Sequence, residues 1–190
     1  MTLKNLAIFA SGGGSNTQKI MDYFEGHPDL KIALVVSNKE EAGVLEKAQK
    51  QGVPTKIIPK STWSDAGFVL EALKTHQIEG IILAGFLLQI PSYLVQAYPH
   101  KIINIHPALL PKFGGKGMYG IHVHQAVKQA GESETGITIH EVNEVYDDGK
   151  IIFQASCDII PSDDPEAIAH KVHLLEHAHF PRVIESYFKA

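Results

Sequence analysis

Hydrophobic residues in the first half of the chain form short continuous runs, and the segments between the runs have the spacing of helices with one apolar face. Continuous runs are typical of strands that are covered on both faces. The runs predict strands at residues 6–10, 32–36, 55–58, 80–84 and 101–105. The segments between them predict helices at residues 16–25, 42–51, 65–76 and 92–97. This order of strands and helices predicts an α/β fold with a doubly wound, mostly parallel sheet.

The pattern changes after residue 120. Residues 121–130 predict another helix, whereas 135–142 and 150–160 alternate between apolar and polar positions on either side of a turn at 146–149. We therefore expect a C-terminal antiparallel hairpin that extends the sheet. Residues 163–188 predict a long final helix with Asp163 or Asp164 as its N-cap. Nothing resembling a linker or a repeat interrupts these elements, so residues 1–190 are expected to form a single domain.

The composition is that of a globular protein with one sizeable core: 190 residues, 44% hydrophobic and 20% charged. A net charge of −4 disfavours binding to nucleic acid or to an anionic membrane. Arg182 is the only arginine, so a guanidinium cluster for phosphate is not expected. Cys157 is the only cysteine and is expected to be a packed thiol in a reducing compartment. With no signal-peptide pattern and no apolar stretch of membrane length, a cytoplasmic location is expected.

A glycine-rich loop follows the first predicted strand and leads into a helix. Such loops let backbone N–H groups approach an anion, and the helix N-terminus adds positive potential. Ser15 or Asn16 could cap this helix or donate to a ligand. Thr17 replaces the third glycine of the dinucleotide fingerprint, and Ser37-Asn38 follow the second strand where an acidic residue would be expected. A phosphomonoester is therefore the better match; a tight turn without a ligand is the alternative.

Asn104 and His106 lie at the carboxyl end of a predicted parallel strand, where open α/β sheets bind ligands. Their spacing of two residues makes the side chains project to the same side, and Pro107 keeps His106 extended. An amide N–H and a protonated imidazole at one point would stabilise an oxyanion. No serine or cysteine nucleophile is evident beside them, which favours attack by a substrate amine. The alternative is a capped strand end with a structural histidine.

Five segments together resemble the folate-dependent formyltransferases, in the order in which they occur in that family: "SGGGSN" (11–16), "LAGFLLQI" (83–90), "NIHPALLPKF" (104–113), "GITIHEV" (136–142) and "YDDG" (146–149). The resemblance extends from Leu6 to Phe188. It implies transfer of a formyl group from the co-substrate 10-formyltetrahydrofolate to the glycinamide amine of 5-phosphoribosylglycinamide, in de novo purine biosynthesis. It also implies small-molecule substrates, no metal, no nucleic-acid or membrane partner, and a monomer or homodimer. The N-terminal half would bind the phosphorylated substrate, and the C-terminal half would bind folate and carry the catalytic residues.

For the chemistry, the resemblance implies that Asn104 and His106 bind the formyl oxygen, with His106 as an imidazolium. Asp147 would keep that imidazole protonated and hold a proton-relaying water. Asp148 is the neighbouring alternative, and a simple turn could explain both aspartates. His140 is similar to a family histidine near the site and is given a supporting role.

For binding, the resemblance implies that Gly14, Ser15 and Asn16 hold the substrate phosphate and that Glu176 contacts the ribose. The folate-binding residues would be Asn104 and the segment Phe86, Leu87, Leu88, Gln89 and Ile90. This segment often reads Gly-Phe-Met-Arg-Ile-Leu in the family, so the side-chain contacts of the pocket differ here; a plain buried strand end is the alternative. The loop at 112–122 contains four glycines and is expected to form a mobile lid.

The sequence also allows other interpretations. His173, Glu176 and His177 fit an H-x-x-E-H zinc motif, but a solvated helix face is the favoured interpretation because a zinc site needs a third ligand. Methionyl-tRNA formyltransferases carry an additional C-terminal domain, whereas this chain is expected to end with its last helix. A sugar-nucleotide formyltransferase shares the catalytic trio, and a non-catalytic phosphate-binding module would need only the glycine loop.

Overall fold

The computed structural model describes residues 3–189 and contains a seven-stranded sheet with the order β3-β2-β1-β4-β5-β6-β7. The first five strands are parallel: β1 (Lys4–Phe9), β2 (Leu30–Ser37), β3 (Thr55–Ile57), β4 (Ile78–Leu83) and β5 (Ile102–His106). The last two, β6 (Glu134–Glu141) and β7 (Ile151–Asp158), are antiparallel to their neighbours. The predicted α/β class, with a mostly parallel sheet and a C-terminal antiparallel hairpin, is confirmed.

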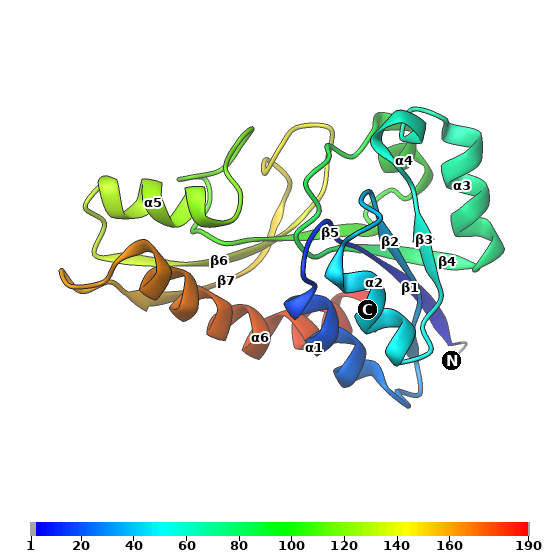
Figure 1. Cartoon of the computed structure of the whole chain (residues 1–190), viewed down its shortest axis with the longest axis horizontal. Helices are drawn as coiled ribbons and strands as arrows, with labels where there is room; N and C mark the ends of the chain where they lie inside the picture. Colours follow the sequence, from blue (N-terminus) through cyan, green and yellow to red (C-terminus); the bar gives the residue numbers. More distant parts are fainter. Residues whose placement is uncertain (1–2, 190) are drawn as a thin grey trace.

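Helices cover both faces of this sheet (Figure 1). On one face lie α1 (Ser15–Phe24), α2 (Gly43–Lys50) and α6 (Pro165–Lys189), and on the other lie α3 (Ala66–Thr75) and α4 (Ser92–Ala97). The short α5 (Ile121–Gln129) packs against α6, and a 3₁₀ turn, η1 (Lys60–Thr62), precedes α3. The turn η1 was not predicted from the sequence.

The burial of β1 explains why the first strands are continuous apolar runs. Leu6 and Ile8 belong to the core on the α1/α6 face, whereas Ala7 and Phe9 belong to the core on the α3/α4 face, and all four are fully buried. Both faces of the strand are therefore covered by helices. In β7, by contrast, exposed and half-buried residues mostly alternate, because this strand forms one edge of the sheet.

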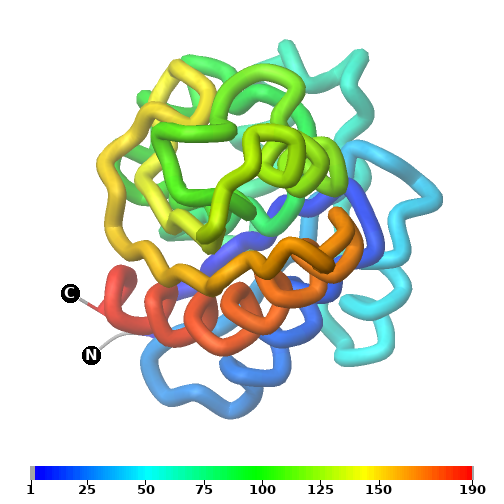
Figure 2. Tube along the Cα trace, turned by 90° about the vertical axis from the view of Figure 1, so that its left-hand side faces the viewer, coloured from blue at the N-terminus to red at the C-terminus, as the bar shows by residue number. Residues whose placement is uncertain are grey.

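The long helix α6 lies beside α1 and brings the end of the chain back to its beginning (Figure 2). Of the two predicted N-caps, Asp164 has this role, because its Oδ1 accepts a hydrogen bond from the N–H of Ala167 at 2.8 Å. The helix continues through Pro181, although a proline cannot donate to the preceding turn. Near its end, the Phe188 carbonyl accepts a hydrogen bond from Lys4 Nζ at 2.7 Å. Within residues 3–189, no helix has both the length and the apolar character needed to cross a membrane.

Candidate active site

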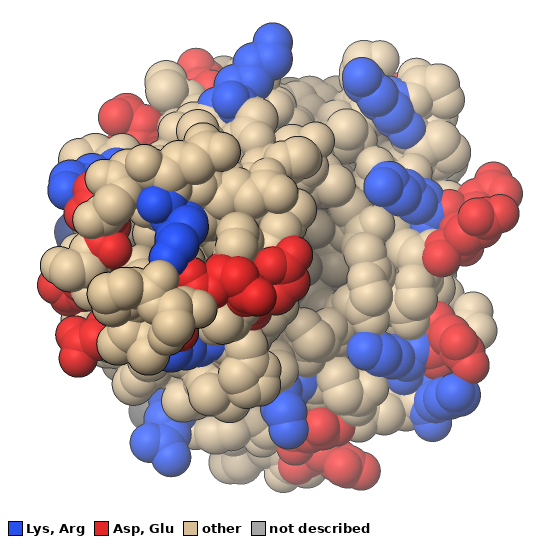
Figure 3. Space-filling view, turned by 60° about the vertical axis from the view of Figure 1, so that its left-hand side comes forward, with Lys and Arg blue, Asp and Glu red and all other residues tan. Residues whose placement is uncertain are grey.

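A cavity of about 730 Å³ lies where the chain reverses its direction across the sheet. The chain runs from β1 outward to β3 and then returns to pair β4 with the other side of β1, so the loops after β1 and β4 diverge at this point. Open α/β sheets bind ligands at such positions, next to the carboxyl ends of the strands. Figure 3 shows a hollow between the two halves of this face of the molecule, with acidic and basic side chains dispersed around it.

The structure brings the residues that the sequence favoured for binding or chemistry to this one cavity. The lining includes the glycine loop, the end of β5, the segment after β4 and parts of β6, the β6–β7 turn and α6. The singled-out residues in the lining are Gly14, Ser15, Asn16, Phe86, Leu87, Leu88, Gln89, Ile90, Asn104, His106, His140, Asp147 and Glu176.

The glycine loop has two kinds of glycine. Gly14 has φ +72°, and a Cβ on it would lie 2.6 Å from Val44 Cγ2, so the backbone and its packing both require glycine there. At Gly12 and Gly13 a Cβ would meet nothing within 4 Å, so these residues face open space. The predicted capping by Ser15 or Asn16 is wrong: α1 begins at Ser15, its N-cap is Gly14, and no side chain caps it.

Asn16 instead contacts α6. Its Nδ2 donates a hydrogen bond to Glu176 Oε2 at 2.9 Å, and the same oxygen lies 3.7 Å from His173 Nε2. Glu176 is only 5% exposed, and this burial raises the pKa of its carboxyl against the opposing effects of Asn16 and His173. The end of the cavity next to the glycine loop therefore contains a buried carboxyl that holds its proton more tightly than usual.

At the other end of the cavity, His106 is the last residue of β5 and is 3% exposed. Its Nε2 lies 2.8 Å from the carbonyl of Phe113, which can only accept, so Nε2 carries the proton of a neutral ring. Its Nδ1 lies 3.5 Å from Asp147 Oδ2. Burial lowers the pKa of His106 and outweighs the opposing effects of Asp147 and Phe113. That Asp147 keeps this ring protonated stays a prediction, which burial opposes and the neighbouring carboxylate favours.

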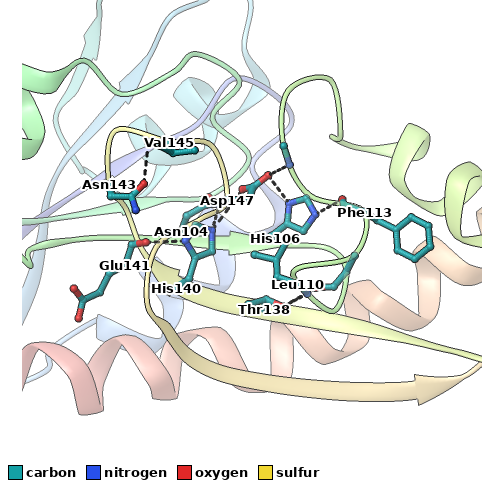
Figure 4. Close-up of polar contacts among 12 residues, drawn as sticks. Asn104, His106, Leu110, Phe113, Thr138, His140, Glu141, Asn143, Val145 and Asp147 are labelled. Carbon is teal, nitrogen blue, oxygen red and sulfur yellow. Dashed lines mark hydrogen bonds and ion pairs between the residues drawn. The ribbon is translucent and has the colours of Figure 1, made fainter.

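Asp147 lies in the turn between β6 and β7, with its carboxylate between the rings of His106 and His140 (Figure 4). Oδ2 accepts the Gly115 N–H at 2.8 Å, and Oδ1 lies 3.5 Å from His140 Nε2. Burial alone would raise the pKa of Asp147, but His140, His106 and the Gly115 N–H together lower it. Asp148, the neighbouring candidate, is exposed and is not part of the lining. The structure thus places a charged carboxylate at position 147 beside two imidazoles.

His140 fixes the side chain of Asn104. The two residues are partners in the β5–β6 ladder, and His140 Nδ1 lies 2.7 Å from the carbonyl of Glu141, to which it donates. Asn104 Nδ2 lies 3.1 Å from His140 Nε2, which accepts from this amide while it carries no proton and stabilises the Asp147 carboxylate when it is protonated. One hydrogen of the Asn104 amide is thereby committed to His140, which leaves the second hydrogen for another acceptor.

The segment after β4, residues 86–90, is held in place by hydrogen bonds to several other parts of the chain. The N–H of Leu87 donates to Ser11 Oγ at 3.0 Å, and the carbonyl of Gln89 accepts from Trp63 Nε1 at 3.0 Å. Gln89 Nε2 donates to the carbonyl of Glu144 at 3.0 Å, which ties this segment to the loop that contains Asp147. The Gln89 side chain therefore contacts a neighbouring loop of the protein itself.

Sequence reasoning missed two contributors to the segment after β4, Ser11 and Trp63. It also did not assign a role to His124, which is 4% exposed, lines the cavity and has no hydrogen-bond partner for Nδ1 within residues 3–189. Burial, assisted by the charges of His173 and His106, lowers the pKa of His124 to about 4. The sequence feature that could have identified His124 as buried is the helical spacing of α5. In this helix Val123, His124 and Val127 are buried and His122 is exposed.

His173 and His177 lie near each other on α6, with ring centroids 6.1 Å apart. In the part of the chain from residue 3 to residue 189, no group of three histidine, cysteine, aspartate or glutamate residues is arranged to hold a metal ion. Glu176, the third residue of the sequence motif, faces the cavity and Asn16 instead.

A switch-point cavity with a glycine loop at one end and an Asn–His–Asp cluster at the other is an arrangement suited to group transfer onto a phosphorylated substrate. The chain belongs to the formyl transferase family, whose model matches residues 4–184. It is 42% identical over 188 residues to the phosphoribosylglycinamide formyltransferase of Bacillus subtilis (strain 168), covering 96% of this chain and 94% of that protein.

Two further proteins are similar to this chain. The chloroplastic phosphoribosylglycinamide formyltransferase of Arabidopsis thaliana is 43% identical over 187 residues; the match covers 95% of this chain, which spans 64% of that relative's length. The crystal structure of glycinamide ribonucleotide transformylase 1 from Geobacillus kaustophilus superposes with a TM-score of 0.87 at 38% identity. That match covers 95% of this chain and 96% of the Geobacillus chain. The fold is thus shared over essentially the whole described chain.

Proposed function

We propose that this chain transfers the formyl group of 10-formyltetrahydrofolate to the glycinamide amine of 5-phosphoribosylglycinamide, a step of purine biosynthesis. The observation that carries the proposal is that one cavity joins the glycine loop, the segment 86–90 and the cluster of Asn104, His106 and Asp147. The similarity to the Bacillus enzyme over nearly the full length of both chains supports this choice of substrate.

The reaction begins when the lone pair of the substrate amine attacks the formyl carbon. A C–N bond forms, and the π electrons of the formyl group move onto its oxygen. The second N–H of Asn104 and the N–H of His106 donate to this oxyanion, which places two donors where the charge develops. For His106 this requires Nε2–H to leave the Phe113 carbonyl, its partner at 2.8 Å. Collapse of the intermediate breaks the bond to N10 of the folate, and the proton lost by the amine ends on that nitrogen.

Asp147 supports the transition state through His106. The pKa of Asp147 is lowered by His140, His106 and Gly115 against the effect of burial, so its carboxylate is charged in the neutral pH range. As negative charge develops on the formyl oxygen, the affinity of the His106 ring for a proton rises. A carboxylate 3.5 Å from Nδ1 stabilises the imidazolium that then forms. The ring takes its extra proton from the attacking amine through a water on Asp147, and gives it to N10 of the folate when the intermediate collapses.

The remaining residues bind the two substrates. The phosphate binds at Gly14, Ser15 and Asn16, where the N-terminus of α1 provides unpaired N–H groups. Glu176 binds a ribose hydroxyl, and the segment 86–90 binds the pterin ring of the folate. The loop 112–122 acts as a lid, because its Phe113 carbonyl and Gly115 N–H contact His106 and Asp147, so its movement changes the partners of both.

We infer further that residues 1–190 act as one domain on small-molecule substrates in the cytoplasm, as a monomer or homodimer and without a nucleic-acid or membrane partner. Supporting observations are the net charge of −4, the single free Cys157 and the continuous seven-stranded sheet. Light scattering coupled to size exclusion measures the oligomeric state directly.

The proposal is tested by an absorbance assay of folate turnover with purified protein and 10-formyltetrahydrofolate. Two amine acceptors are compared, 5-phosphoribosylglycinamide and an amino sugar nucleotide, with the phosphate-free glycinamide ribonucleoside as matched control. We expect turnover with the first and a kcat/KM at least a hundredfold lower with the control, because the phosphate is bound by several charge-assisted hydrogen bonds. Preference for the sugar nucleotide, or no turnover by folded protein, overturns the assignment.

A further inference from the structure

Ser11 connects the two loops that leave neighbouring strands at the switch point. It follows β1, begins the glycine loop and is 3% exposed. Its backbone N–H donates to the carbonyl of Gly85 at 3.0 Å, and its Oγ accepts the N–H of Leu87 at 3.0 Å. Its hydroxyl hydrogen is directed to Asn38 Oδ1, 2.6 Å away. One residue thus bonds to both ends of the tripeptide 85–87.

The hydroxyl of Ser11 has a fixed direction. A hydroxyl has one hydrogen and two lone pairs, and because Asn38 accepts the hydrogen, a lone pair is available to the N–H of Leu87. The serine therefore acts as an oriented acceptor in a nearly dry site, where leaving a donor unpaired is costly.

Side-chain packing alone does not fix Leu87. Phe86 is anchored between Phe9 and Trp63, with ring centroids at 5.5 and 5.2 Å. The Leu87 side chain is 42% exposed, and the preceding Gly85 has φ +75°, a conformation with few steric restraints for glycine. The Ser11 hydroxyl is consequently the group that fixes the main chain of Leu87 where it lines the cavity.

We propose that Ser11 is a positioning residue that sets the folate segment relative to the phosphate loop and thereby the affinity for the formyl folate. The inference rests on the proposed function, since it assumes that the segment 86–90 binds folate. Ser11 is hydrogen-bonded to Leu87 of the segment and to the preceding Gly85, and acts on the folate through them.

The test compares Ser11→Ala with Thr17→Val. Thr17 is a fully buried hydroxyl-bearing residue at the start of α1, and its Oγ1 has no hydrogen-bond partner within residues 3–189, so its replacement is a matched control. For Ser11→Ala we expect a five- to tenfold weaker Kd for tetrahydrofolate by calorimetry and a similar rise in KM for the formyl folate, about the effect of one lost hydrogen bond. The KM for 5-phosphoribosylglycinamide should stay within about twofold, and Thr17→Val should change neither.

A general loss of stability would not separate the two substrates in this way, and thermal melting of both variants reports it independently. An unchanged folate affinity in Ser11→Ala, or equal weakening of both substrates, overturns the inference. Wild-type protein that binds no tetrahydrofolate contradicts the proposed function instead, so the two failures are distinguishable.

If Ser11→Ala does not fold, Asn38→Ala provides the second variant, because it removes the acceptor that orients the hydroxyl. Its folate Kd should rise about two- to threefold, less than for loss of the hydroxyl itself. No change in this variant overturns the inference as well.

Discussion

The two ends of the cavity each contain a carboxyl group, that of Glu176 buried and that of Asp147 half-buried, and their surroundings shift the pKa in opposite directions. At the glycine-loop end, burial raises the pKa of Glu176 against the opposing Asn16 amide and His173. At the β5 end, burial also acts to raise the pKa of Asp147, but two histidines and the Gly115 N–H overcome it and lower the pKa. Burial alone therefore does not decide the protonation of a carboxyl group. The number and distance of the groups that stabilise the charge decide it.

This difference suggests a division of roles. Asp147 is kept charged beside His106, as needed to stabilise an imidazolium during the reaction. Glu176 shares one oxygen between Asn16 and His173, which suits a group that binds and orients a ribose hydroxyl. Replacing each carboxyl by the matching amide removes the charge, preserves the shape and separates the two roles.

The largest effect is expected for Asp147→Asn. Loss of the charge beside His106 should lower kcat/KM by about a thousandfold, in the range of general acid–base and electrostatic contributions. Steady-state kinetics, under the same conditions for the variant and the wild type, measure this loss of kcat/KM. Asp148→Asn is the matched control, because Asp148 is the exposed neighbour outside the cavity, and it should retain nearly full activity. Equal activities of the two variants would remove Asp147 from the mechanism.

A smaller effect is expected for Glu176→Gln. The amide removes the carboxyl that binds the ribose hydroxyl, so the KM for 5-phosphoribosylglycinamide should rise about tenfold. It preserves the shape of the side chain and leaves the Asp147 end of the cavity untouched, so kcat should change little. The same kinetic assay, with the amine substrate varied, gives both constants. A kcat that falls as far as in Asp147→Asn would show that the two carboxyls do not differ in role.

His124 extends the comparison to a buried base. Its pKa of about 4 lies below that of an unfolded histidine, so the unfolded chain binds a proton more readily between the two values. Stability from this residue is present above pH 6.5 and is lost as the pH falls toward 4. His124→Gln should reduce the loss of unfolding free energy between pH 7 and pH 5 by about 2 kcal/mol, measured by urea denaturation. The exposed His122→Gln is the control for the substitution itself.

The smallest effects concern stability at the two carboxyls. With a raised pKa, Glu176 contributes stability that is present at low pH and lost as the pH rises through its folded pKa. With a lowered pKa, Asp147 contributes stability that is present above its unfolded pKa and lost as the pH falls. Relative to wild type, Glu176→Gln should therefore be more stable at pH 7 than at pH 3, and Asp147→Asn less stable. Urea denaturation at both pH values measures the signs, and equal signs would contradict the comparison.

The fold was predictable from local patterns, because the apolar runs correspond to β1 through β5 and the alternation after residue 120 to β6 and β7. Boundaries and caps were less accurate. Ser15 and Asn16 look like caps, but Gly14 occupies that position in a left-handed conformation and Asn16 bonds to Glu176, 160 residues away. Such a contact depends on how α1 and α6 pack, which the local sequence does not determine.

For the site, the spacing of Asn104 and His106 was enough to predict that they share a side of β5, and both line the cavity. The resemblance to the family was needed to single out Asp147 and Glu176. The Ser11 contact with Leu87 spans 76 residues, and the partner of His106 Nε2 is a carbonyl in a glycine-rich loop. The sequence indicates a carboxylate near His106 but not the extent of burial, which lowers the pKa of this histidine.

The most direct test is a ¹³C NMR titration of the side-chain carboxyls in protein labelled at aspartate and glutamate, with Asp147→Asn and Glu176→Gln used to assign the two signals. The division of roles predicts that Asp147 titrates below the ordinary range of an aspartate and that Glu176 titrates above the ordinary range of a glutamate. Titration of both groups within their ordinary ranges, or in the reverse order, would contradict it.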